Sequence, residues 1–200
     1  LEENPDARIV EMDTVYNDVS NGPFIQTFKF LQYDLLICIY HESKTSDEML
    51  KGILLLEQYL GPDIFNVEVE VLLTDRGSEF VSASEAEYRE DGSRRTRVYY
   101  CDSMCSWQKG SLENVHLLLR EICPNKTDLY ALGLTSQEKA NIISSHINSY
   151  PKKKLKGKSS FQLLEFINPD MADRLHQAGL FVVQSDKVTL KPYLLKTNSR

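Results

Sequence analysis

The chain has 200 residues, 42% of them apolar and 26% charged, a composition that excludes wholesale disorder and collagen-like structure and suits one well-buried domain. Residues 151–200 carry ten Lys and Arg against four Asp and Glu, a net charge of +6, whereas the first 150 residues carry 13 against 25, a net charge of −12. Such an acidic body argues against nucleic-acid binding, because phosphate contacts need Lys and Arg, unless its carboxylates gather metal ions.

The start of the chain predicts three strands in succession. The segments are rich in β-branched, aromatic or other apolar residues, and turn residues separate them. They span residues 8–16, 24–31 and 35–40. Because the connections are short, we expect an antiparallel meander.

A helix and two further strands follow. Thr45–Glu48 has the sequence of a capping box, and the apolar residues after it recur at helical spacing up to Gly61-Pro62, where we expect the helix to end. Residues 67–74 and 97–101 are strand-like. The polar residues 76–95 between them predict a long loop with one helical turn.

The remaining segments are mainly helical in pattern. An apolar stripe over residues 106–122 predicts one helix, and a second capping box at Thr135–Glu138 predicts another that stops before Pro151. A further helix is expected over residues 161–178, followed by a short strand-like tail over residues 188–195.

This order of elements predicts a mixed α/β domain over residues 1–150. Its five-stranded sheet combines the three antiparallel strands with two further strands and is flanked by helices. Residues 151–200 are expected to form a small, basic C-terminal extension.

Three carboxylates stand where a site would be expected. Asp13 lies inside the first strand among apolar residues, and Asp75 ends the fourth, where open α/β sheets place ligands. Glu113 falls beside the apolar stripe of its helix. Carboxylates that converge repel one another unless divalent cations neutralise them, and oxygen ligands suit Mg²⁺ or Mn²⁺. The alternative for Asp13 is an acid at a strand edge. For Asp75 it is a turn residue, and for Glu113 an acid in the first turn of a helix.

Four segments carry a family resemblance over about residues 8–160. They resemble the catalytic core of bacterial insertion-sequence transposases, most closely the insertion-sequence-thirty family, within the retroviral-integrase superfamily of RNase H-like folds. The segments are V-E-M-D-T-V-Y, L-L-T-D-R-G-S-E-F, Y-Y-C-D-S-M-C-S-W-Q-K-G-S-L-E-N and H-I-N-S-Y-P-K-K-K-L-K-G-K-S. Each is short, but their shared order is specific.

The resemblance implies that Asp13, Asp75 and Glu113 form an Asp-Asp-Glu triad that holds two divalent ions, Mg²⁺ or Mn²⁺. The ions would activate water, and then a DNA 3′-hydroxyl, for attack on phosphodiester bonds. The implied partners are DNA, as transposon ends and target, and further copies of the chain assembled on DNA. We expect no membrane partner, since no apolar run approaches the roughly 18 residues of a span, and we expect a place in the bacterial cytoplasm at the nucleoid.

Basic residues offer contacts to DNA phosphates. Arg120 could contact DNA or pair with an acid at the core edge, and His116 could contact DNA or pack within the helix. The resemblance places a basic stretch after the core, here Lys152, Lys153 and Lys154. A second cluster comprises Arg94, Arg95 and Arg97. We expect at least one cluster to contact DNA, the alternative being a solvated surface loop.

Other polar residues in these segments are expected to be structural. Two are rival carboxylates, Glu79 and Asp102. Three belong to the fourth segment, where helix-end hydrogen bonds are expected, and they are His146, Asn148 and Tyr150.

The sequence departs from the family pattern in three places. Arg76 stands where the family usually has Asn, and a cation there could weaken metal binding or take a phosphate. Asn125-Lys126-Thr127 replaces a usual Lys-Gly-Thr and so loses a glycine. Only twelve residues precede Asp13, so we expect the helix-turn-helix domain that recognises transposon ends to be missing from this chain.

Three functions therefore remain open. The first is the catalytic core of a DNA transposase. The second is a related RNase H-like nuclease that cuts DNA without joining it. The third is a core with a decayed site that serves as an interaction module; the complete triad argues against it, and Arg76 argues weakly for it.

Overall fold

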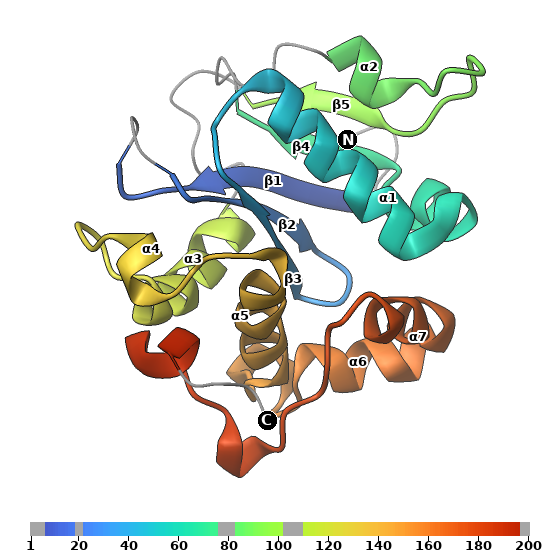
Figure 1. Cartoon of the computed structure of the whole chain (residues 1–200). Coiled ribbons are helices and arrows are strands. Elements are labelled where there is room, and N and C mark those ends of the chain that lie inside the picture. The colour runs from blue at the N-terminus through green and yellow to red at the C-terminus, as the bar shows by residue number, and fades with distance from the viewer. Residues whose placement is uncertain (1–6, 19–21, 76–82, 102–109, 197–200) are drawn as a thin grey trace.

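The computed structural model describes residues 7–18, 22–75, 83–101 and 110–196. Within them, five strands form one mixed sheet in the order β3-β2-β1-β4-β5 (Figure 1). The strands are β1 (Ile9–Val15), β2 (Phe24–Phe30), β3 (Leu35–His41), β4 (Val71–Thr74) and β5 (Arg97–Tyr100). The first three form the predicted antiparallel meander, and β4 and β5 continue the sheet in parallel with β1. The predicted five-stranded sheet is confirmed.

Helices cover both faces of this sheet. They are α1 (Ser46–Glu68), α2 (Ala83–Glu87), α3 (Gly110–Ile122), α4 (Leu129–Leu132), α5 (Gln137–Ser149), α6 (Ser160–Ile167) and α7 (Pro169–Gln177). Short 3₁₀ turns follow at η3 (Lys153–Leu155), η4 (Ser185–Lys187) and η5 (Pro192–Lys196). In the described part of the chain, no helix combines the length and the apolar character needed to cross a membrane.

Alternating residues of β1 pack into two separate hydrophobic cores, because successive side chains of a strand point to opposite faces. Val10 and Met12 belong to a buried cluster shared with α1, α6 and α7. Val15 belongs to a second cluster shared with α3 and α5. Asp13 follows the alternation of Val15, so its side chain leaves the sheet on the face that α3 and α5 cover.

Side chains of α5 satisfy the outer edge of β3, beside which the described residues place no further strand. In Figure 1, α5 lies next to β3. The Asn148 amide accepts from the Leu36 backbone N–H at 2.8 Å and donates to the Leu36 carbonyl at 2.6 Å. Ser144 Oγ accepts from the Cys38 N–H at 2.9 Å, and Gln137 Nε2 donates to the Cys38 carbonyl at 3.0 Å. An open strand edge invites pairing with another chain, and this helix covers it. The internal role predicted for Asn148 is confirmed.

The first helix does not end at Gly61-Pro62 as predicted. It kinks there, with Gly61 at φ 74°, and continues to Glu68. Proline is tolerated in the first turn of a helical segment, so the chain re-enters the helix after the kink and buries Phe65. The following strand is shorter than predicted because residues 67 and 68 belong to the helix.

The second capping box begins one residue later than predicted. Ser136, not Thr135, is the N-cap, and its side chain accepts from the Lys139 N–H at 3.4 Å. Gln137 is therefore the first helical residue, which brings its amide to the edge of β3.

The single helix predicted over residues 161–178 is two helices. Asn168 ends α6, and its side chain caps α7 by accepting from the Met171 N–H at 3.1 Å. Pro169 then occupies the first position of α7, which suits its missing N–H. The strand-like tail over residues 188–195 is also wrong, since 3₁₀ turns take its place and Pro192 has no N–H to offer a sheet.

The segment after residue 150 packs into the same interior as the sheet. Phe161, Leu164 and Leu175 are fully buried in the cluster that contains α1. Leu194 and Leu195 are buried in the cluster that contains α3 and α5. The extension predicted from composition thus contributes to both cores.

Candidate metal and DNA site

The parallel pairing of β1 and β4 runs toward two of the predicted carboxylates. Its register joins Ile9 to Val71 and Glu11 to Leu73, and the paired residues end there, two positions before Asp13 and Asp75. Asp75 directly follows β4, so we expect the same offset to bring the two aspartates to one face of the sheet. Both aspartates are partly buried.

Asp13 lies in the central strand of the sheet, which excludes the alternative of an acid at a strand edge. Its Oδ1 accepts from the Thr14 N–H at 2.8 Å, and its carbonyl accepts from Thr27 Oγ1 at 3.2 Å. Both bonds hold the peptide group that joins Asp13 to Thr14.

Hydrogen bonds hold α3, the helix that carries Glu113, to β1 and β2. The Leu112 N–H donates to Glu11 Oε2 at 2.6 Å, and His116 Nε2 lies 3.1 Å from Thr27 Oγ1. Because the Thr27 hydroxyl already donates to the Asp13 carbonyl, it accepts from the imidazole N–H. Glu113 lies between these two fastenings and is exposed.

The triad provides carboxylate oxygens, the donors that Mg²⁺ and Mn²⁺ prefer, so the residues fit the expected ions in chemistry. Among the residues that the structure describes, no three side chains of His, Cys, Asp or Glu are grouped as metal ligands. Glu79 and Asp102, the rival carboxylates, and Arg76 lie outside the described residues.

Arg120 turns inward instead of toward a ligand. Its guanidinium donates to Asn17 Oδ1 at 2.6 Å and to the Tyr16 carbonyl at 3.3 Å, and burial lowers its pKa. Arg120 therefore holds the end of α3 to the residues that follow β1. These partners are an amide and a carbonyl in place of the acid considered above, and a contact of Arg120 with DNA stays a prediction. The bond of His116 with Thr27 follows its packed-helix alternative.

The three predicted lysines separate into different environments. Lys152 is buried, and its ammonium donates to the Asp34 carbonyl and to Ser160 Oγ, both at 2.7 Å. It also pairs with Asp34 Oδ2 at 2.9 Å. Lys152 is thus a core residue, and its expected DNA contact is corrected. Lys153 and Lys154 are exposed, although Lys154 also reaches Asp34, at 2.5 Å.

Lys153 and Lys154 line a groove of about 360 Å³ together with Ser111 and Asn114 of α3. Asn114 directly follows Glu113. The groove therefore joins exposed ammonium groups to the helix that carries the third carboxylate.

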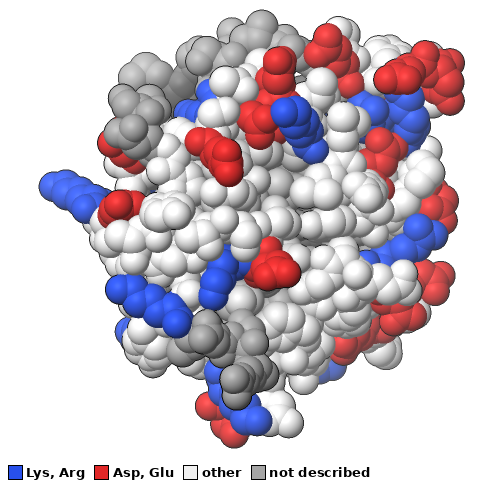
Figure 2. Space-filling model, in the orientation of Figure 1, with Lys and Arg blue, Asp and Glu red and all other residues white. Residues whose placement is uncertain are grey.

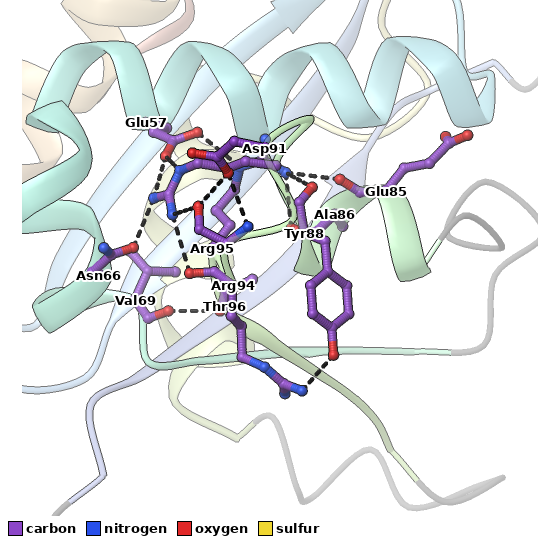
Figure 3. A network of polar contacts seen from close by, with 12 residues as sticks. Glu57, Asn66, Val69, Glu85, Ala86, Tyr88, Asp91, Arg94, Arg95 and Thr96 are labelled. Carbon is purple, nitrogen blue, oxygen red and sulfur yellow. Dashed lines mark hydrogen bonds and ion pairs between the residues drawn. The ribbon is translucent and has the colours of Figure 1, made fainter.

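In the arginine cluster near β5, Arg95 is buried, whereas Arg94 and Arg97 are exposed; Figure 3 shows the polar contacts of Arg94 and Arg95. Arg95 is buried and pairs with Glu57 of α1 at 2.7 Å, and Arg89 pairs with the same carboxylate at 2.5 Å. Arg94 lies over the ring of Tyr88. Arg97 pairs with Glu70 at 3.3 Å. These residues tie the connection between α2 and β5 to α1 and to the sheet.

Charge on the visible surface is mixed. On the face shown in Figure 2, Lys and Arg side chains are spread among acidic and uncharged groups instead of forming one stripe.

Residue 126 takes the conformation that a glycine would favour. Lys126 has φ 63°, in the left-handed region, at the position where the family usually has glycine. A non-glycine residue there costs about 1–2 kcal/mol. The neighbouring carbonyls of Pro124 and Thr127 accept from Asn17 Nδ2 at 2.8 and 2.6 Å, which hold this loop against the end of β1.

Sequence reasoning missed two parts of this region. Glu11 shares the strand face of Asp13 and carries no other signal in the sequence, but its burial and its bond to α3 make it part of the frame of the proposed site. The buried cluster of Lys29, Asp34 and Lys152 has no local signal that would place Lys152 in it, because Lys152 lies 118 residues from Asp34 in the chain.

Comparison with known proteins gives bacterial relatives of one kind. The chain is 34% identical over 106 residues to the transposase for insertion sequence element IS1086 of Cupriavidus metallidurans, which covers 53% of this chain and 29% of the relative. It is 33% identical over 94 residues to transposase InsI for insertion sequence element IS30A of Escherichia coli, covering 47% of this chain and 23% of the relative. The match spans less than a third of either relative. No family model matches the sequence.

Solved structures share the fold. The simian T-cell lymphotropic virus intasome in complex with PP2A regulatory subunit B56 gamma gives a TM-score of 0.58 at 16% identity, covering 78% of this chain and 53% of that chain. The catalytic core domain of BIV integrase gives 0.50 at 18% identity, covering 78% and 93%. The resemblance to insertion-sequence transposases and the RNase H-like fold of integrase cores are both confirmed.

Proposed function

We propose that this relative of insertion-sequence transposases is the catalytic core of a DNA transposase that cuts and joins phosphodiester bonds. The observation that best supports the proposal is the β1–β4 register, which runs toward Asp13 and Asp75, together with the bond that holds α3, the helix of Glu113, to β1. The named relatives support the reaction class, and their hosts suggest that the chain acts on DNA in a bacterial nucleoid.

In this proposal Asp13, Asp75 and Glu113 hold two divalent ions, Mg²⁺ or Mn²⁺. Such ions lower the pKa of the attacking hydroxyl and stabilise charge on the leaving oxygen. The protein's own part is to keep the carboxylates in place: the bonds to Thr14 and Thr27 hold Asp13, and those from Leu112 and His116 hold α3.

Binding of Mn²⁺ tests the site directly. A cation that binds only the folded protein stabilises it by mass action, by about 2.7 kcal/mol at a hundredfold excess over its dissociation constant. We therefore expect millimolar Mn²⁺ to raise the melting temperature, and Asp75→Asn to remove most of this rise. Glu121→Gln, on the exposed face of α3, is the matched control and should keep it. A wild-type melting curve that ignores Mn²⁺ would favour the decayed interaction module.

Strand transfer separates a transposase from a nuclease. Supplied with pre-cut transposon ends and a target duplex in Mn²⁺, the chain should join the 3′-hydroxyl to the target. Cleavage of a duplex without any joining would identify the nuclease. Sedimentation of the reaction mixture should show several copies of the chain on each DNA pair, because two ends and a target must be held together.

DNA phosphates should be bound by the lysines of the groove. The double variant Lys153→Ala/Lys154→Ala should weaken DNA binding and flatten the plot of log affinity against log salt by up to about 0.9 per lost contact. Lys152→Ala is not used, because Lys152 is buried against Asp34. Lys154 also pairs with Asp34, although its side chain is exposed, so Lys153→Ala alone, which leaves that pair intact, is tested beside the double variant. Lys187→Ala, an exposed lysine outside the groove, is the control.

Fluorescence anisotropy across a salt series measures both the affinity for DNA and its dependence on salt concentration. Binding should be weak and equal for a terminal-repeat duplex and a scrambled one, since contacts to phosphates carry no sequence information. An unchanged salt slope in the double variant would show that the groove is not the DNA contact. Tight preference for the terminal repeat would show that the core itself reads sequence.

A further inference from the structure

Glu11 places a carboxylate in the interior beside the proposed metal ligands. The residue is 3% exposed and lies in the central strand β1, two positions before Asp13 and on the same face. A buried carboxylate costs several kcal/mol unless its oxygens are bonded. The contacts of Glu11 therefore explain why an acid is kept at this position.

One of these contacts is with the first turn of α3. The Leu112 N–H donates to Glu11 Oε2 at 2.6 Å, and both groups are buried. The helix begins at Gly110, so this amide is one of the donors that the helix itself leaves unpaired. A carboxylate there also meets the positive end of the helix dipole, and such charged hydrogen bonds are about twice as strong as neutral ones.

The bond fixes the element that carries Glu113. Leu112 immediately precedes Glu113, and the second fastening, between His116 and Thr27, lies about one turn further along α3. A helix held at two points one turn apart cannot slide along β1 without breaking a bond. Both bonds to α3 come from the sheet next to Asp13: Glu11 lies in β1, the strand of Asp13, and Thr27 lies opposite Asp13 in β2.

We propose that Glu11 is a positioning residue for the metal site: its carboxylate caps α3 from β1 and so holds Glu113 at the distance from Asp13 that shared ions require. This inference rests on the proposed function. Its role depends on an acceptor oxygen at the right reach and not on metal contact by Glu11 itself.

Three variants separate reach from charge. Glu11→Gln keeps a side-chain oxygen at the same reach without the charge, whereas Glu11→Asp keeps the charge but is one methylene short. Glu11→Ala removes both. Glu68→Ala is the matched control, because Glu68 is also 3% exposed and hydrogen bonded but contacts Tyr33 and Asn168, not α3.

The measurement is Mn²⁺ binding by isothermal titration calorimetry on the whole chain, below the melting temperature of every variant. Loss of a group that orients a ligand costs about 10- to 100-fold in metal affinity. We expect Glu11→Asp and Glu11→Ala to raise the Mn²⁺ dissociation constant by about tenfold or more. Glu11→Gln and Glu68→Ala should leave it within a few-fold. If Glu11→Ala does not fold, the Mn²⁺ dissociation constants of Glu11→Gln and Glu11→Asp are compared without it, and a higher value for Glu11→Asp supports the inference.

Two results would overturn the inference while leaving the proposed function intact, provided that Asp13→Asn abolishes binding. One is an unchanged dissociation constant in Glu11→Asp and Glu11→Ala. The other is a loss in Glu11→Gln as large as in Glu11→Ala, which would show that the charge of Glu11, and not an acceptor oxygen at the right reach, sets the affinity for Mn²⁺. If the wild type does not bind Mn²⁺, or if Asp13→Asn binds it as tightly as the wild type does, the proposed function fails instead.

Discussion

Replacing Asp13 or Asp75 with asparagine should lower Mn²⁺-dependent DNA cleavage by about 1,000-fold or more. A metal ion supplies several kcal/mol of transition-state stabilisation, and each 1.36 kcal/mol is a factor of ten in rate. Asparagine is nearly the same size as aspartate, and its oxygen can still accept from the Thr14 N–H, so the strand keeps its local bonds. Glu113→Gln should behave in the same way.

The measurement is nicking of an end-repeat duplex over a Mn²⁺ series, with melting temperatures recorded in parallel. Stability without metal should stay equal or rise, because each change removes repulsion between like charges. Glu121→Gln on the same helix should cleave normally. Cleavage close to that of the wild type in any one of the three variants would show that the triad is assigned wrongly.

Asp34→Asn should lower the free energy of unfolding by about 3–5 kcal/mol, the usual cost of removing one partner from a buried ion pair. Asp34 is buried and pairs with Lys29, Lys152 and Lys154. Its backbone has φ 52°, which asparagine also tolerates, so the change removes charge without new backbone strain. Urea denaturation measures the loss, and the exposed Asp173→Asn serves as control.

The loss should depend on pH in a defined direction. Three lysines lower the pKa of Asp34 to about 2, against the opposing effect of burial. Stability from a carboxylate with a lowered pKa is present above its unfolded value of 3.8 and disappears as the pH falls toward 2. Wild type and Asp34→Asn should therefore converge between about pH 4 and pH 2. A difference that stayed constant over this range would exclude the ion pairs as its cause.

The sequence determined the elements whose signals are local. The strands of the meander follow from runs of β-branched and aromatic residues, and Thr45 caps α1 as its position predicts, by accepting from the Glu48 N–H. The motif around Asp75 indicated the end of β4. Helix ends were predicted wrongly at two places. The helix kinks at Gly61-Pro62 and continues, whereas a helix predicted to be continuous is divided in two at Asn168.

Only the tertiary structure decided which charges meet. Nothing near Asp13 in the sequence states that its strand pairs with β4 in the register that joins Glu11 to Leu73. Lys152 and Lys153 are identical neighbours in the sequence, yet one is buried on Asp34 and the other lies at the surface. The reason is physical: a charged side chain is kept in the interior only where a partner from another element compensates its lost hydration, and that partner is fixed by packing across the chain.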